Sequence, residues 1–273
     1  MQVEQRMMFR FGCGGYFEGY DLVEVFEVDS GYKLSYKCVS FDAKKMFVDL
    51  PEVKVEKLLR FMDSEVNDRW YCHYVNPCVL DGTQWELHDG RFKRYGSNFF
   101  PKGFGRLMHF LSCELGCEGL ERYWDVPEDE LDEHQELAIL AAYGAWHLDS
   151  GRQEDCEGGP EDDWDNNGEG VEDVEMTARQ LYHDLYLFLG HYPRYKDYGR
   201  ILAENGIPLD VGLIKSHDVR DASPECIVAI VLAMSRAERF GCEGIFDECV
   251  RDGTFGKWLR RLRETLEQSP WFE

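Results

Sequence analysis

The chain has 273 residues, with 53 acidic and 30 basic side chains, and its formal net charge is −23 at pH 7. This acidic balance disfavours direct binding to nucleic acid or to an anionic membrane through a general basic field. Apolar residues make up 44% of the chain, and its length exceeds that of one typical domain. We therefore expect two folded units, each with its own core.

The sequence contains no run of about 18 uncharged apolar residues, which argues against a membrane-spanning helix. Residues 1–11 mix charged side chains with single apolar residues, unlike a secretory signal peptide. Ten cysteines are scattered along the chain, and no Cys-x-x-Cys pair occurs among them. These features predict a soluble cytoplasmic protein with reduced thiols and without a structural zinc ion.

Residues 1–117 are predicted to form an α+β domain with an antiparallel sheet. Apolar and polar residues alternate over residues 7–39, as in half-buried strands, and Gly12, Gly14 and Gly15 predict a turn within this stretch. The further elements expected are a helix at 52–68, a hairpin at 83–95 that turns at Asp89-Gly90, and a helix at 101–115.

Two stretches of this domain carry a recurring pattern. Leu80 to Leu87 (LDGTQWEL) combines an Asp-Gly turn with a Trp-containing strand, and Tyr95 to Pro101 (YGSNFFP) combines Gly-x-Asn with a Pro-started helix. Together they resemble a pattern of uncharacterised bacterial proteins, and this resemblance implies no assigned activity. A structural interpretation also accounts for the residues: Trp85 fills the core and Asn98 supplies a loop or cap hydrogen bond.

The excess negative charge is concentrated in one segment. Residues 1–110 hold 16 acidic and 15 basic side chains, residues 111–175 hold 22 and 2, and residues 176–273 hold 15 and 13. The middle block therefore accounts for 22 minus 2, or 20, of the 23 excess negative charges. One segment makes the protein acidic.

Residues 118–175 are predicted to form an acidic helix and a linker between the two domains. The helix is expected over residues 127–148, where an acidic first turn precedes a periodic apolar set. Residues 149–175 are rich in Gly, Asp and Glu and have almost no apolar periodicity, so we expect a linker or long loop there.

A short motif in this linker resembles the first half of a calcium-binding loop. Asp163, Asp165 and Asn167 stand at alternate ligand positions, and Gly168 follows where the loop turns. The final ligand position holds Val174 in place of glutamate, and no helix is expected before the motif. Two alternatives stay open: a weak calcium site formed by the first three residues, or an acidic solvated loop.

Residues 176–273 are predicted to form an all-α bundle, because helical periodicity is separated by clear start and stop signals such as Ser223-Pro224 and Asp252-Gly253. The helices are expected at 174–190, 193–205, 224–240, 244–251 and 255–268.

The C-terminal domain carries a second resemblance. Arg236, Glu238, Arg239 and Phe240 form an Arg-x-Glu-Arg-Phe core within Ile227 to Leu262. This region is similar to a small helical domain family of unknown function found in bacteria and their mobile elements, which implies an all-helical fold and no catalytic role. Two interpretations of the charged residues stay open: a Glu-Arg clamp that locks the next helix, or an anion or peptide pocket on the two arginines.

Signatures of common enzymes are absent from the sequence, including the nucleophile elbow, the phosphate loop and the dinucleotide fingerprint. His109, Cys113 and Cys117 share one helical stripe, and half-buried packing explains them better than a metal site. His73, His88 and His183 are acid–base candidates by residue type alone.

We therefore expect a non-enzymatic acidic interaction protein that binds a basic, nucleic-acid-binding partner by charge mimicry, in the manner of a phage or mobile-element inhibitor of the anti-CRISPR kind. The alternative is a small-molecule-binding protein or enzyme with its site at the domain junction. The residues predicted to bind the partner are Asp129, Glu130, Asp162, Asp163, Asp165, Glu169, Glu172 and Asp173.

Overall fold

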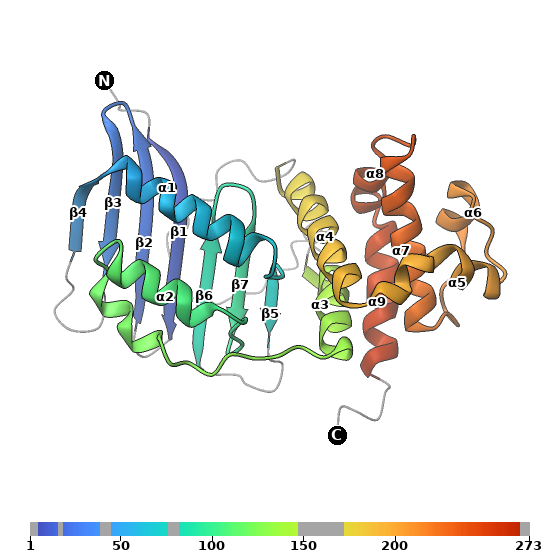
Figure 1. The fold of residues 1–273 in the computed structure, drawn as a ribbon. Coiled ribbons are helices and arrows are strands. Elements are labelled where there is room, and N and C mark those ends of the chain that lie inside the picture. The colour runs from blue at the N-terminus through green and yellow to red at the C-terminus, as the bar shows by residue number, and fades with distance from the viewer. Residues whose placement is uncertain (1–4, 16–18, 39–44, 76–81, 147–171, 268–273) are drawn as a thin grey trace, which may run out of the picture. The chain divides into compact units, whose positions relative to one another are not determined.

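The computed structural model describes residues 5–15, 19–38, 45–75, 82–146 and 172–267. The chain divides into two compact units, Met1–Glu130 and Leu131–Glu273, called unit 1 and unit 2 below. Unit 1 combines a sheet with helices and the described part of unit 2 is helical, which confirms the predicted α+β class (Figure 1). None of the described helices has the length and apolar character needed to cross a bilayer.

Unit 1 is built on a seven-stranded sheet with the strand order β4-β3-β2-β1-β6-β7-β5. The strands are β1 (Arg6–Gly15), β2 (Gly19–Val28), β3 (Gly31–Lys37), β4 (Lys45–Leu50), β5 (His73–Val75), β6 (Thr83–His88) and β7 (Lys93–Ser97). Neighbouring strands are antiparallel except β5 and β7, which run parallel. The predicted hairpin at 83–95 is present as β6–β7, and the alternating stretch at 7–39 contains β1, β2 and β3, whereas the sequence did not reveal the edge strands β4 and β5.

The turn predicted at the glycines of residues 12–15 is wrong. Gly12, Gly14 and Gly15 form no turn, because they lie inside β1 and are paired with β2 on one side and β6 on the other. A Cβ atom at residue 14 would lie 2.0 Å from the backbone oxygen of Gly19. Glycine here therefore permits close approach of neighbouring backbones rather than chain reversal.

Helices cover one face of the sheet in unit 1 (Figure 1). They are α1 (Glu52–Phe61), the π-helical turn η1 (Met62–Asn67), α2 (Phe104–Cys113) and the 3-10 helix η2 (Glu118–Tyr123). α1 and η1 together cover most of the predicted helix at 52–68. The second predicted helix starts later than residue 101, because Gly103 precedes α2 with a φ of 91° that glycine adopts without strain.

The core of unit 1 is rich in aromatic rings and confirms the predicted role of Trp85. This side chain is 2% exposed, and its Nε1–H donates to the carbonyl of Phe99 at 2.8 Å. Its ring lies against Trp70 and Phe104, at centroid separations of 5.7 and 5.6 Å. A Cβ at Gly96 would lie 2.3 Å from Trp85 Nε1, so this neighbour on β7 must be glycine.

Unit 2 consists of helices over its described residues. They are α3 (Glu133–Trp146), α4 (Glu172–His191), η3 (Pro193–Asp197), α5 (Tyr198–Glu204), α6 (Val211–Ser216), α7 (Pro224–Arg239), α8 (Ile245–Arg251) and α9 (Thr254–Glu267). The five predicted C-terminal helices correspond to α4, to η3 with α5, and to α7, α8 and α9. The short helix α6 was not predicted from the sequence.

The bundle is organised around α7, which is buried without interruption from Cys226 to Ser235. Ser223 begins this helix as predicted, since its hydroxyl accepts from the backbone N–H of Cys226 at 3.2 Å. Close packing also joins α3 to α9. A Cβ at Gly144 would lie 2.6 Å from the backbone nitrogen of Arg260, so glycine at this point lets the two helices approach each other closely.

The unit boundary after Glu130 falls inside the segment predicted to separate two domains. Of residues 118–175, η2 lies in unit 1 and α3 lies in unit 2. The predicted helix at 127–148 begins at Glu133 instead, because Asp132 caps it. The predicted linker at 149–175 lies outside the described residues as far as residue 171, and its last residues begin α4.

Candidate functional site

The acidic segment was the main candidate for a binding surface, and the structure describes its first part. Between Glu114 and Glu136 the chain has ten acidic side chains and one basic side chain, Arg122. Several of these carboxylates accept hydrogen bonds within their own unit. They are therefore part of the fold, as the following contacts show.

In unit 1, acidic residues near the boundary hold the start of α2. Glu128 Oε1 accepts from the backbone N–H of Gly105 at 3.1 Å, in the first turn of that helix. Asp129, predicted to bind a partner, accepts from the backbone N–H of Phe100 at 2.9 Å. Glu130, also predicted to bind a partner, is 85% exposed at its side chain and lies 3.5 Å from the ammonium of Lys102. Asp129 is thus engaged inside unit 1, whereas Glu130 points to the surface.

In unit 2, Asp132 and Gln135 begin α3 with reciprocal hydrogen bonds. The backbone N–H of Gln135 donates to Asp132 Oδ1 at 2.8 Å, and the backbone N–H of Asp132 donates to Gln135 Oε1 at 2.9 Å. This capping box satisfies donors that the first helical turn would leave open. The carboxylate of Asp132 therefore has a structural role at the helix start.

Two further carboxylates of α3 connect it to the end of α4 and to η3. Glu136 is buried, with its side chain 4% exposed, and it accepts from Nδ1–H of His191 at 2.9 Å. Glu133 accepts from the hydroxyl of Tyr195 at 2.9 Å and pairs with Arg194. Burial, followed by the negative charge of Glu136, raises the pKa of Tyr192 to about 12. The neutral Tyr192 hydroxyl donates to Glu136 at 3.5 Å.

The remaining acidic charge lies farther along the chain. Residues 147–175 hold 12 acidic side chains and one basic side chain, a net charge of −11. Four of the eight predicted partner-binding residues and all three calcium candidates lie outside the described residues: Asp162, Asp163, Asp165, Asn167 and Glu169. Glu172 and Asp173 lie in the first turn of α4.

The charged end of α7 favours one of the two interpretations of the Arg-x-Glu-Arg-Phe core. Glu238 accepts from the backbone N–H groups of Gly244 and Phe246, both at 2.9 Å, and so caps the start of α8. Glu238 therefore locks the next helix directly. Within the described chain Arg236 and Arg239 make no ion pair, and they are half-buried and exposed, respectively. The anion or peptide pocket on these arginines stays a prediction.

Unit 1 contains a buried polar cluster that the sequence analysis did not identify. The carboxylate of Asp21 on β2 is fully buried and accepts from the guanidinium of Arg122. That guanidinium also lies over the ring of Tyr123, with its Cζ 4.8 Å from the ring centre. The alternation of β2 indicates that the Asp21 side chain is buried, because Asp21 lies on the same inward face as Val23 and Val25.

The thiols of this cluster are protonated. Burial raises the pKa of Cys13 and of Cys117 to about 12. Burial also raises the pKa of the Tyr36 phenol, with a further contribution from its contact with Cys38. A neutral buried thiol is neither a nucleophile nor a good metal ligand. The cluster therefore fits a structural role better than a reactive one.

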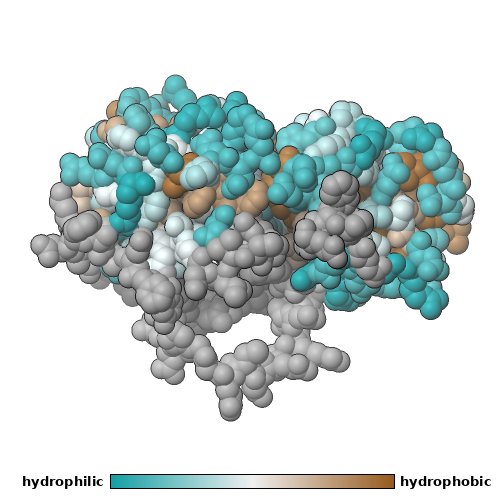
Figure 2. All heavy atoms as spheres, turned by 90° about the horizontal axis from the view of Figure 1, so that it is seen from below, coloured by the Kyte–Doolittle hydropathy of each residue, from teal (hydrophilic) through white to brown (hydrophobic). Residues whose placement is uncertain are grey.

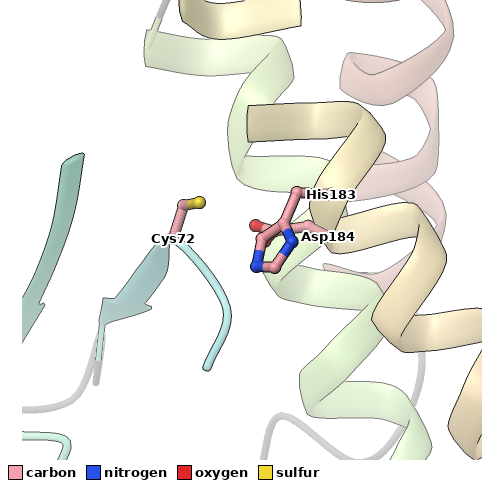
Figure 3. A group of neighbouring side chains, drawn as sticks. All are labelled: Cys72, His183 and Asp184. Atoms are coloured by element: carbon pink, nitrogen blue, oxygen red, sulfur yellow. The ribbon is translucent and has the colours of Figure 1, made fainter. Parts of the chain in front are cut away.

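Two of the three predicted metal candidates, His109 and Cys113, lie on the same helix. His109 Nε2 lies 3.8 Å from Cys113 Sγ on α2, whereas Cys117 lies past the end of that helix and is buried. His183 and Asp184 are consecutive residues of α4 in unit 2 (Figure 3). The carboxylate of Asp184 accepts from the hydroxyl of Tyr143 at 2.7 Å.

Cys72, also drawn in Figure 3, directly precedes β5 in unit 1. It is one of eight cysteines in the described chain. Since it belongs to unit 1, whereas His183 and Asp184 belong to unit 2, the three side chains are features of separate units.

The described surface is mainly hydrophilic, with smaller hydrophobic patches, in the view of Figure 2. Some large apolar side chains are nevertheless well exposed. In unit 1 these are Tyr20, Phe47, Val48, Val53 and Leu59, and in unit 2 they are Tyr182, Tyr186, Leu209, Leu213 and Phe240. Exposed apolar groups that gather at one place mark interaction surfaces more often than scattered ones do.

Comparison with known proteins gives no relative: no family model, no curated protein and no solved structure matches this chain. The resemblances of the two domains to uncharacterised bacterial patterns therefore stay predictions.

Proposed function

We propose that this protein is a non-enzymatic interaction protein whose acidic segment, residues 149–175, binds a basic surface of a nucleic-acid-binding protein. One observation carries the proposal. The carboxylates of residues 128–136 are largely engaged in the fold, whereas residues 147–175, which run from the end of α3 into the first turn of α4, carry a net charge of −11.

A dense run of carboxylates attracts a basic partner through long-range electrostatics and competes with the phosphates that the partner normally binds. The carboxylates of Asp162, Asp163, Asp165, Glu169, Glu172 and Asp173 are the proposed contact groups. Asp129 is a weaker candidate than these six residues, because its carboxylate accepts a hydrogen bond from the backbone N–H of Phe100. Glu130 keeps its place among the candidates because its side chain is 85% exposed.

More specifically, we propose that this protein is an inhibitor of the anti-CRISPR kind, which acts in the cytoplasm on a nuclease or an RNA-guided effector. Such effectors hold nucleic acid in positively charged channels, which an acidic segment of this density can occupy. The support for this form is the placement of charge, together with the resemblance of the C-terminal residues Arg236 to Phe240 to a family found on mobile elements.

The proposal is tested by direct binding to purified basic nucleic-acid-binding proteins, including an RNA-guided nuclease and a non-specific nuclease. Each complex is challenged with a DNA oligonucleotide and with rising salt. Mimicry predicts that DNA and this protein displace each other and that salt weakens the complex. Binding that neither DNA nor salt weakens would refute charge mimicry.

A matched pair of variants locates the binding groups. The first neutralises the six proposed carboxylates by Asp→Asn and Glu→Gln. The second neutralises six exposed carboxylates elsewhere, so that both variants change the net charge equally: Asp68, Glu121, Asp125, Asp221, Glu225 and Glu243. At about 0.2–1 kcal/mol for each exposed ion pair, the first variant loses about 1–6 kcal/mol of binding free energy. The second variant keeps most of its affinity.

A further inference from the structure

The outer edge of the sheet in unit 1 is formed by β4, whose position is clear in Figure 1. Within the described chain β4 pairs with β3 on one side and has no strand on the other. Alternate residues of an edge strand direct both N–H and C=O groups outward, where they offer a template for another strand. Edge strands in monomeric proteins are usually protected from this by charges, proline or bulges.

β4 lacks such protection at its centre. Phe47 is 61% exposed and Val48 is 41% exposed, so that both faces of the strand present apolar side chains to solvent. Val53 in the first turn of α1, three residues after β4, is 58% exposed. Three of the five large apolar side chains that are exposed in the described part of unit 1 therefore lie between residues 47 and 53.

The sequence of β4 is complementary to itself when two copies run antiparallel. With Phe47 opposite Phe47 of a second copy, Met46 of each copy stands opposite Val48 of the other. This register keeps the two faces of the sheet continuous, because opposed residues in an antiparallel pair lie on the same face. It matches an aromatic pair and two apolar pairs, which stabilise neighbouring strands.

Another register that preserves the faces fits less well. A shift that places Val48 opposite its own copy brings Phe47 opposite Asp49, which pairs an aromatic ring with a carboxylate.

We propose that the protein forms a two-fold symmetric dimer through antiparallel pairing of β4 with β4 of a second copy, centred on Phe47. The two sheets then become one continuous sheet, and the open hydrogen-bonding edge of each copy is satisfied. The apolar side chains at residues 47 and 48 are removed from water in the same step. This surface lies in unit 1, and the proposal does not depend on the acidic segment.

The test is the oligomeric state of the full chain, measured by analytical ultracentrifugation over a concentration range of about 1–200 µM. The proposal predicts a concentration-dependent monomer–dimer equilibrium and greater protection of β4 amides from hydrogen exchange at high concentration. A monomer at every concentration would overturn it.

A comparison of variants uses two exposed phenylalanines. F47K should abolish the dimer, whereas F240K, which changes a 76% exposed side chain in unit 2, should leave the dimer Kd unchanged. Circular dichroism checks that each variant is folded. A dimer Kd unchanged by F47K, or loss of the dimer with F240K, would contradict this interface.

Discussion

The carboxylate of Glu136 offers the most direct test of the structural role of the acidic helix α3. Its side chain is 4% exposed, and it accepts hydrogen bonds from His191 at 2.9 Å and from Tyr192 at 3.5 Å. Glu136→Gln keeps the volume of the side chain but removes its charge. A hydrogen bond to a charged group contributes about 1.5–3 kcal/mol, and the amide oxygen of glutamine retains part of that interaction.

We therefore expect Glu136→Gln to destabilise the α3–α4 packing by about 1–2 kcal/mol, which corresponds to an opening equilibrium about 5–30 times larger. Hydrogen exchange with mass spectrometry measures this in peptides from α3 and from the end of α4. The control is Glu130→Gln, which neutralises a side chain that is 85% exposed and should change protection little.

A double-variant cycle checks that the effect passes through the histidine. Glu136→Gln combined with His191→Phe should cost less than the sum of the two single changes, because both remove the same hydrogen bond. Unchanged exchange in α3 and α4 for Glu136→Gln would refute the structural role of this carboxylate.

Three further outcomes are expected. In the native protein at pH 8, the buried thiol of Cys13, with its pKa raised to about 12, should resist alkylation, while the exposed Cys113 reacts, as peptide mass spectrometry can measure. Burial, and then the nearby ammonium of Lys93, lowers the pKa of His88 below its ordinary value of about 6.5. The neutral imidazole therefore stabilises the folded protein above pH 6.5, and this stabilisation is lost as the pH falls through the lowered pKa. Urea unfolding between pH 7.5 and 5 should show a smaller loss of stability for His88→Gln than for the unaltered protein. Gly144→Ala should destabilise the α3–α9 packing by about 1–3 kcal/mol, because the new methyl group meets backbone rather than a flexible side chain; equal thermal stability would contradict that close approach.

Local sequence signals predicted the long helices and the hairpins well, because those signals depend on near neighbours along the chain. Ser223 begins α7 through a hydrogen bond to a residue three positions later, which the sequence shows directly. The edge strand β4 was missed because exposed Phe47 and Val48 break the alternation of a half-buried strand.

Long-range contacts explain the remaining differences between prediction and structure. Gly14 forms no turn, since its neighbour Gly19 on β2 approaches too closely for any side chain. The contact of Glu136 with His191 joins residues 55 positions apart, and no local pattern indicates it. The charge count located the acidic residues along the chain, but it could not show which of their carboxylates are bound within the fold.

We propose that the acidic residues after α3, rather than acidic charge in general, bind a basic partner. The most direct measurement compares the partner affinity of the two charge-matched variants, one neutralised at six carboxylates between Asp162 and Asp173 and the other at six exposed carboxylates elsewhere. We predict a loss of about 1–6 kcal/mol for the first variant, with a shallower dependence of affinity on salt, and little loss for the second. Equal affinities of the two variants would contradict the claim.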